Sequence, residues 1–227
     1  MYWVTIAIAP AIALVWFFYV RGAYRPVRKS LIALLFLSGG AAALLALTLN
    51  HLVEKYTLLW PGAPEQLHRI LFWFFGVGLN EEFAKMVPLL LLFYPRRHFK
   101  TPYQGLLAAV SVALGFAALE NLFYLERYGS LTVLTRSVLT VPAHAFFTAP
   151  LGVMMAYSRQ ASGVLGKYLW LLGGLSVATA LHGLYDVWLS LDSEWLEWIA
   201  YLQVVLMGLL VLKLMRLRPT TVSKEPA

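Results

Sequence analysis

Two adjacent glutamates, Glu81 and Glu82, lie in an apolar stretch, and Lys85 follows within one helical turn. The stretch from 72 to 94 is long and apolar enough to cross a bilayer as a helix. A charged side chain there costs about 2.5–3.5 kcal/mol on insertion scales, so paired carboxylates in this position indicate function. On a helix the two point about 100° apart, and Lys85 is within reach of either. This spacing is typical of one carboxylate neutralised by the lysine and another free to act as a base.

Further ionisable residues lie inside the three apolar blocks that follow. Glu120 precedes Asn121 in one block, and His144 lies near the middle of the next. In the last, His182 and Asp186 are spaced i, i+4 on one helical face, so that Asp186 can accept a hydrogen bond from an imidazole nitrogen and fix its tautomer. Because the blocks are consecutive, we expect these side chains to converge on one buried polar site.

The residue types exclude several kinds of intramembrane peptidase site. The sequence contains no His-Glu-x-x-His zinc motif and no cysteine, and Asp186 is the single aspartate inside an apolar block. Ser111 and Ser176 lack the glycine-rich turn of a serine nucleophile. A glutamate–histidine site remains, in which a glutamate deprotonates a water and a histidine holds the water or stabilises the oxyanion. The same groups can instead ligate a divalent metal that activates the water.

The elements that must position these residues are membrane helices. Of the 227 residues, 60% are hydrophobic and only 13% are charged, about half the charged fraction of a soluble domain. The apolar residues gather in blocks of bilayer length without strand periodicity. The sequence therefore predicts an all-α, polytopic membrane helical bundle of about seven transmembrane helices in the cell membrane. The predicted blocks are at about 2–20, 31–50, 68–94, 103–125, 131–157, 168–190 and 196–213.

Basic residues cluster in every second connection between these blocks, at 21–29, 96–100, 159–167 and after 213. The positive-inside rule then places the N-terminus outside and the C-terminus in the cytoplasm. In this orientation the polar residues lean toward the outer half of the bilayer. The basic residues lie in separate short loops, so the net charge of +7 indicates no nucleic-acid partner.

Four short motifs, taken in order, are similar to those of a known family. They are Glu81-Glu82-x-x-Lys85, Phe116-x-x-x-Glu120-Asn121, Pro-Ala-His144 and His182-Gly-Leu-Tyr-Asp186. Together they resemble the motifs of PrsW-type intramembrane proteases, which are relatives of the CAAX prenyl protease and bacteriocin-processing superfamily. The resemblance covers residues 72–190 and leaves the first two blocks and the last outside it.

The resemblance implies a helical membrane protease in which Glu81 and Glu82 are the central acids. It further implies that Glu120, His144 and His182 complete the site, and the supporting residues are Lys85, Asn121 and Asp186. PrsW-type enzymes make the site-1 cut in membrane-anchored anti-sigma factors on the extracytoplasmic side. A single-span membrane protein, such as an anti-sigma factor, is therefore the expected substrate.

Several points stay open at the level of sequence. A metal such as zinc, if one is used, would be held by ligands from Glu82, Glu120, His144 and His182, and the alternative is a direct glutamate mechanism without metal. A proton-coupled transporter or a non-catalytic binding or immunity protein of the same superfamily is the alternative function. We expect residues 1–218 to form one transmembrane domain with a protease-like core at 68–190. A disordered cytoplasmic tail is expected at 219–227.

Overall fold

The computed structural model describes residues 2–21, 27–56, 62, 64–96, 99 and 101–216. The tail expected at 219–227 lies outside these ranges. Within them the chain forms helices and no strand, which confirms the all-α prediction. The elements are α1 (Tyr2–Arg21), α2 (Lys29–Tyr56), α3 (Glu65–Leu71), η1 (Phe72–Leu79), α4 (Asn80–Pro88), η2 (Leu89–Phe93), α5 (Pro102–Tyr128), α6 (Ser130–Val138), α7 (Thr140–Gln160), α8 (Gly163–Ser190) and α9 (Glu194–Leu214).

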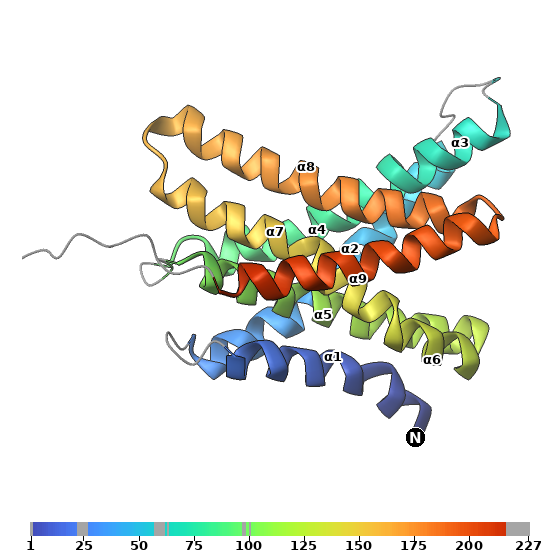
Figure 1. The fold of residues 1–227 in the computed structure, drawn as a ribbon, viewed down its shortest axis with the longest axis horizontal. Helices are drawn as coiled ribbons and strands as arrows, with labels where there is room; N and C mark the ends of the chain where they lie inside the picture. The colour runs from blue at the N-terminus through green and yellow to red at the C-terminus, as the bar shows by residue number, and fades with distance from the viewer. Residues whose placement is uncertain are drawn as a thin grey trace, which may run out of the picture.

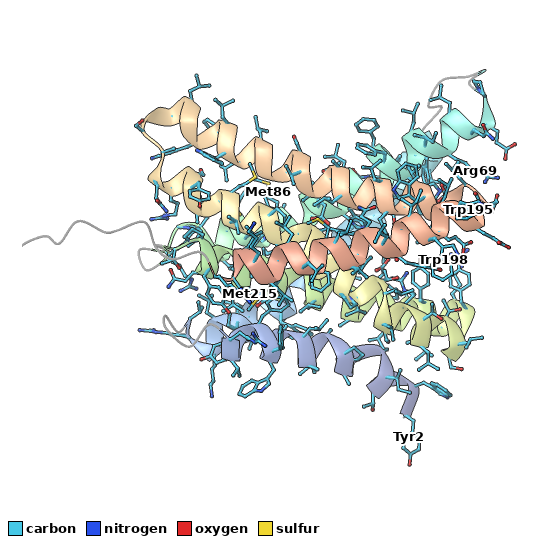
Figure 2. All side chains as sticks on the ribbon, viewed as in Figure 1. Tyr2, Arg69, Met86, Trp195, Trp198 and Met215 are labelled. Atoms are coloured by element: carbon cyan, nitrogen blue, oxygen red, sulfur yellow. The ribbon has the colours of Figure 1, made fainter. Side chains whose placement is uncertain are left out.

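Six helical stretches among the described residues are long and apolar enough to cross a membrane. They correspond to α1, α2, α5, α6 with α7, α8 and α9. Large apolar side chains face outward along them, such as Leu37 and Leu131, which are 71% and 77% exposed. Such exposure suits a lipid environment, and the protein is a multi-pass membrane protein. Figure 2 shows Tyr2, Arg69 and Trp195 toward one end of the bundle and Met215 toward the other.

The third predicted block, 68–94, is a composite of α3, η1, α4 and η2 rather than one regular helix. The π-helical segment η1 precedes Asn80, whose side-chain Nδ2 donates to the carbonyl oxygen of Gly76 at 2.7 Å. Pro88 ends α4, since proline has no N–H to continue the α-helical ladder, and η2 follows. Both irregular segments flank the single helical piece that carries the two glutamates.

Helix α5 is the centre of the bundle and packs against α1, α2 and α7 (Figure 1). It begins at a capping box, in which Thr101 and Gln104 satisfy each other's backbone N–H groups. Its contact with α2 is a close backbone approach, because a Cβ atom added to Gly39 would lie 2.0 Å from the carbonyl oxygen of Val112. This packing fixes the depth at which Glu120 and Asn121 of α5 meet the neighbouring helices.

The fifth predicted block, 131–157, is divided into α6 and α7 at Leu139. Pro142 lies three residues later and cannot donate a hydrogen bond to the preceding turn, which accounts for the interruption. The break lets Arg136 on α6 and His144 on α7 both reach Glu120 of α5.

The close approach of α2 and α5 yields a matched test. We expect Gly39→Ala to lower the free energy of unfolding by about 1–3 kcal/mol, because the added methyl group meets backbone that no rotamer can move aside. Gly40→Ala is the control, since its Cβ would find its nearest neighbour at 3.8 Å. Reversible unfolding in mixed micelles measures both, and equal stability of the two variants would contradict this packing.

Candidate active site

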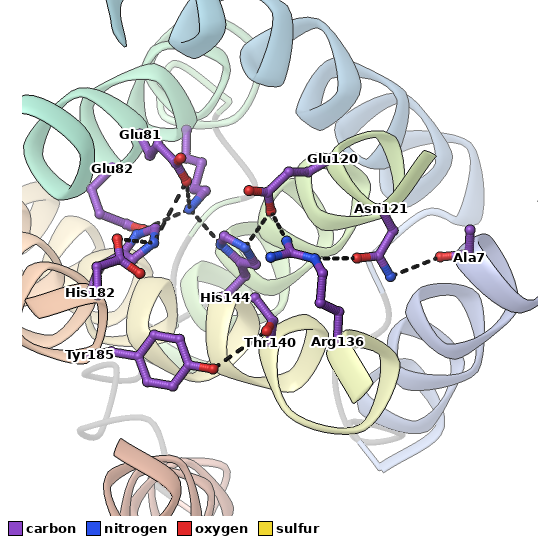
Figure 3. A network of polar contacts seen from close by, with 12 residues as sticks. Ala7, Glu81, Glu82, Glu120, Asn121, Arg136, Thr140, His144, His182 and Tyr185 are labelled. Atoms are coloured by element: carbon purple, nitrogen blue, oxygen red, sulfur yellow. Dashed lines mark hydrogen bonds and ion pairs between the residues drawn. The ribbon is translucent and has the colours of Figure 1, made fainter. Parts of the chain in front are cut away.

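Side chains from four helical elements meet in one buried cluster (Figure 3). Glu81, Glu82 and Lys85 come from α4, Glu120 comes from α5, and His182 comes from α8. His144 of α7 lies between the glutamates of α4 and Glu120. The structure thus brings together the residues that the sequence singled out, from the four consecutive blocks in which they were found.

A glycine contact brings the glutamates next to His182. A Cβ atom added to Gly78 of η1 would lie 2.8 Å from the Cα atom of Gly183 in α8. Gly78 is four residues before Glu82, and Gly183 directly follows His182. Because neither glycine has a side chain, the two backbones approach closely enough for these groups to touch.

The ammonium group of Lys85 is the central charge of the cluster. Its Nζ lies 2.8 Å from Glu82 Oε1, 3.0 Å from His144 Nδ1 and 3.6 Å from Glu81 Oε2. It also lies 4.2 Å from the centroid of the Phe116 ring, and the whole side chain is buried. This arrangement matches the charge-balancing position that the i+3 and i+4 spacings allow.

Glu82 has both carboxylate oxygens engaged by the protein. Oε1 accepts from Lys85 and lies 2.8 Å from His182 Nδ1, and Oε2 accepts from Thr148 Oγ1 at 2.8 Å. The bond to His182 requires the proton on Nδ1, which leaves the lone pair on Nε2. Glu82 therefore sets the tautomer and orientation of His182.

Glu81 differs from its neighbour because its Oε2 is buried and has no hydrogen-bond partner within the described residues. This oxygen lies 3.6 Å from Lys85 Nζ and 3.6 Å from His182 Nε2. Nearly all buried polar atoms in proteins are paired, so an unpaired carboxylate oxygen beside an imidazole nitrogen without a close hydrogen bond is a place for a water or a cation. The two adjacent carboxylates thus have different surroundings, as their helical spacing predicts.

Asp186 does not make the close bond that its i+4 spacing predicts. Its Oδ2 lies 3.5 Å from His182 Nε2, whereas the 2.8 Å bond to the imidazole is made by Glu82. The glycine contact between η1 and α8 brings Glu82 to Nδ1, whereas Asp186 lies nearer to the other nitrogen, Nε2. Asp186 instead lines a cavity that adjoins the cluster.

Glu120 forms the other side of the cluster. Its Oε2 lies 2.8 Å from His144 Nε2 and 2.6 Å from Arg136 Nη2. Asn121 Oδ1 accepts from Arg136 Nε at 3.0 Å. His144 therefore donates from Nε2 to Glu120 and accepts from Lys85 at Nδ1.

Arg136 and Thr148 are site residues that the sequence analysis did not identify. Arg136 lies inside the block 131–157, where an arginine is itself a signal of a buried acidic partner. Thr148 lies four residues after His144 and hence on the same face of α7, which is the signal that could have revealed it.

A cavity of about 450 Å³ connects this cluster with one end of the bundle. Glu81, His144 and His182 line its inner part. Tyr128 and Ser190, at the ends of α5 and α8, line its other end. The cavity gives water and a peptide segment a route to the polar groups.

The donor atoms of Glu81, His144 and His182 fit a metal ion. One ligand atom from each lies within 4.8 Å of the others. Two zinc ligands at bond lengths of about 2.0–2.2 Å are at most about 4.4 Å apart, so this spacing is close to that of a zinc site. It shares His144 and His182 with the expected set and has Glu81 in place of Glu82 and Glu120. Both nitrogens of His144 are already bonded, Nδ1 to Lys85 and Nε2 to Glu120, so one of these bonds would have to give way to an ion.

The charges of the cluster also favour a cation. In the part of the chain that the structure describes, the carboxylates of the cluster are Glu81, Glu82, Glu120 and Asp186, and its cations are Lys85 and Arg136. With the four carboxylates ionised and the histidines neutral, two negative charges would be in excess, which is costly at membrane depth. A divalent ion would balance them.

A multi-pass bundle that holds glutamates and histidines around an internal cavity has the groups that an intramembrane hydrolase needs. The chain belongs to the PrsW family of intramembrane metalloproteases, whose family model matches residues 27–213. It is accordingly a hydrolase, an intramembrane protease, and the transporter and non-catalytic alternatives lose their support. The matched region extends beyond 72–190, the part in which the motifs were noticed, into α2 and α9.

Curated relatives agree with the family match. The chain is 29% identical over 206 residues to "Protease PrsW" of Geobacillus kaustophilus, and the alignment covers 91% of this chain and 86% of the relative. It is 34% identical over 194 residues to "Protease PrsW" of Halalkalibacterium halodurans, with 84% of each protein covered. It is 30% identical to "Protease PrsW" of Bacillus subtilis, with 89% of each covered. No solved structure matches the chain.

The contact between Thr148 and Glu82 can be tested by an isosteric change. We expect Thr148→Val to lower the free energy of unfolding by about 1–3 kcal/mol, because it leaves a buried carboxylate oxygen without its donor. Thr148→Ser keeps the hydroxyl group and is the control. Reversible unfolding in mixed micelles distinguishes them, and a valine variant as stable as the serine variant would refute this contact.

Proposed function

We propose that Glu81 and His182 act on a water that attacks the amide carbonyl carbon of a membrane-anchored protein. The single observation that carries this proposal is the unpaired, buried Oε2 of Glu81, which lies 3.6 Å from His182 Nε2. A carboxylate oxygen without a protein partner can accept the proton of the water. The imidazole lone pair at Nε2 holds the water or, once protonated, stabilises the developing oxyanion.

The other polar residues of the cluster hold these two groups in place. Glu82 orients His182, and Glu120 orients His144. Lys85 neutralises the glutamates without occupying the Glu81 oxygen at hydrogen-bond distance. Orientation of this kind keeps the reacting groups fixed while the substrate binds.

Glu81, His144 and His182 would hold a divalent metal, zinc being the expected ion. When bound, such an ion supplies Lewis-acid activation of the water and the carbonyl. With or without the ion, Glu82 keeps the proton of His182 on Nδ1 and turns Nε2 toward the reacting groups, and Glu120 holds His144. Without the ion, Glu81 accepts the proton of the water.

We propose a single-span membrane protein as the substrate, with an anti-sigma factor as the candidate by family resemblance. The cavity opens at the end of the bundle where α5 ends and α8 ends. The positive-inside rule assigns that end to the extracytoplasmic side. Cleavage there agrees with a site-1 cut, whereas a cytoplasmic opening would suit a prenyl protease.

Two glutamine variants separate the roles of the neighbouring glutamates. We expect Glu81→Gln to reduce cleavage of a single-span substrate about 10²–10⁴-fold, because the proton acceptor is lost. Glu82→Gln should reduce it about 10–100-fold, because it acts through the orientation of His182. The measurement is kcat/KM with purified full-length protein in proteoliposomes.

Glu126→Gln is the matched control for this pair. Glu126 is an exposed glutamate of α5, outside the cluster. Its substitution should leave cleavage unchanged. Full activity of the Glu81→Gln variant, with the protein still folded, would overturn the proposed role of Glu81.

Metal content gives an independent test of the proposed ligands. We expect the purified protein to contain a stoichiometric divalent metal by inductively coupled plasma mass spectrometry. Glu81→Gln and His182→Ala should each lower the bound metal at least about tenfold, since each removes a ligand. Glu126→Gln should not. A metal-depleted protein that retains full activity would instead support a direct glutamate mechanism.

A further inference from the structure

We propose that Arg136 is a positioning residue that orients Glu120 and, through it, His144. This inference rests on the proposed function, because it concerns the same cluster. Arg136 lies on α6, outside the four motifs, and its side chain is only 13% exposed. An arginine at membrane depth needs acidic partners, and the structure shows which one it has.

The guanidinium group is fixed by two adjacent residues of α5. Nη2 lies 2.6 Å from Glu120 Oε2, and Nε lies 3.0 Å from Asn121 Oδ1. A guanidinium presents several N–H donors in one rigid plane, so it can satisfy both acceptors at once. A lysine offers a point charge without that geometry.

The plane of the guanidinium is also set by an aromatic ring. Its central carbon lies 3.6 Å from the centroid of the Tyr124 ring, one turn after Glu120 on α5. Stacking of this kind removes the rotational freedom that an arginine otherwise has. Arg136 is therefore held on three sides by one short stretch of α5.

The effect reaches His144 through a shared oxygen. Glu120 Oε2 is the acceptor for Arg136 and the partner of His144 Nε2 at 2.8 Å. Removing Arg136 leaves Glu120 free to rotate and leaves its charge unbalanced. His144 then loses the acceptor that keeps its proton on Nε2 and its Nδ1 lone pair toward Lys85.

A purely structural role is the competing explanation. Asn121 Nδ2 also reaches the carbonyl oxygen of Ala7 in α1 at 3.4 Å, so Arg136 takes part in joining α1 and α6 to α5 (Figure 3). A residue that only joins helices would affect folding, whereas a residue that positions Glu120 affects turnover through Glu120 alone. The two explanations therefore predict different behaviour of a double variant.

The test compares Arg136→Gln, Glu120→Gln and the double variant in full-length protein in proteoliposomes. We expect Arg136→Gln to lower kcat about 10–100-fold with KM unchanged. Because it acts through Glu120, the double variant should lose no more than Glu120→Gln alone. Arg136→Lys should recover part of the loss by restoring the charge. Arg21→Gln is the control, since Arg21 is exposed, lies over the Phe17 ring and is outside the cluster.

Independent, multiplying losses in the double variant would overturn the inference, as would parental activity of Arg136→Gln. Unfolding of both the glutamine and lysine variants would show that Arg136 joins helices rather than positions Glu120. The proposed function is judged separately by Glu81→Gln. If Glu81→Gln is inactive while Arg136→Gln is active, only the inference about Arg136 fails.

Discussion

The structure depends on the need to pair the buried ammonium group of Lys85. A lysine at membrane depth is costly unless nearby groups accept its hydrogen bonds. Lys85 bonds to Glu82 of its own helix and to His144 of α7. Those partners in turn bond to His182 of α8 and Glu120 of α5. One charge therefore requires four helical elements to meet at one depth.

The same requirement leaves one group available for chemistry. Glu82 and Glu120 use their oxygens to hold histidines and cations. Glu81 is drawn into the cluster by its neighbour but has an oxygen without a partner among the described residues. In the proposed mechanism, most charges of the site hold it rigid and one of them reacts. Membership of the PrsW family agrees with this arrangement, since the family consists of membrane metalloproteases.

The sequence predicted the apolar blocks and the polar residues inside them, because bilayer length and the cost of buried charge are properties of composition. It did not predict the π-helical segments around α4 or the break at Leu139, which depend on backbone hydrogen bonds within a packed bundle. The i, i+4 spacing of His182 and Asp186 predicted a hydrogen bond between them, because spacing along one helix is visible in a sequence. The contact of Gly78 with Gly183, which brings Glu82 within 2.8 Å of His182 Nδ1, is not visible there.

We propose that Glu82 holds the buried lysine and that Glu81 takes part in the reaction. A double-mutant cycle in reversible unfolding tests it most directly, with Lys85→Met combined in turn with Glu82→Gln and Glu81→Gln. We expect a coupling energy of about 1–3 kcal/mol between Lys85 and Glu82, and a clearly smaller one between Lys85 and Glu81. Equal coupling of the two glutamates to Lys85, or stronger coupling of Glu81, would contradict it.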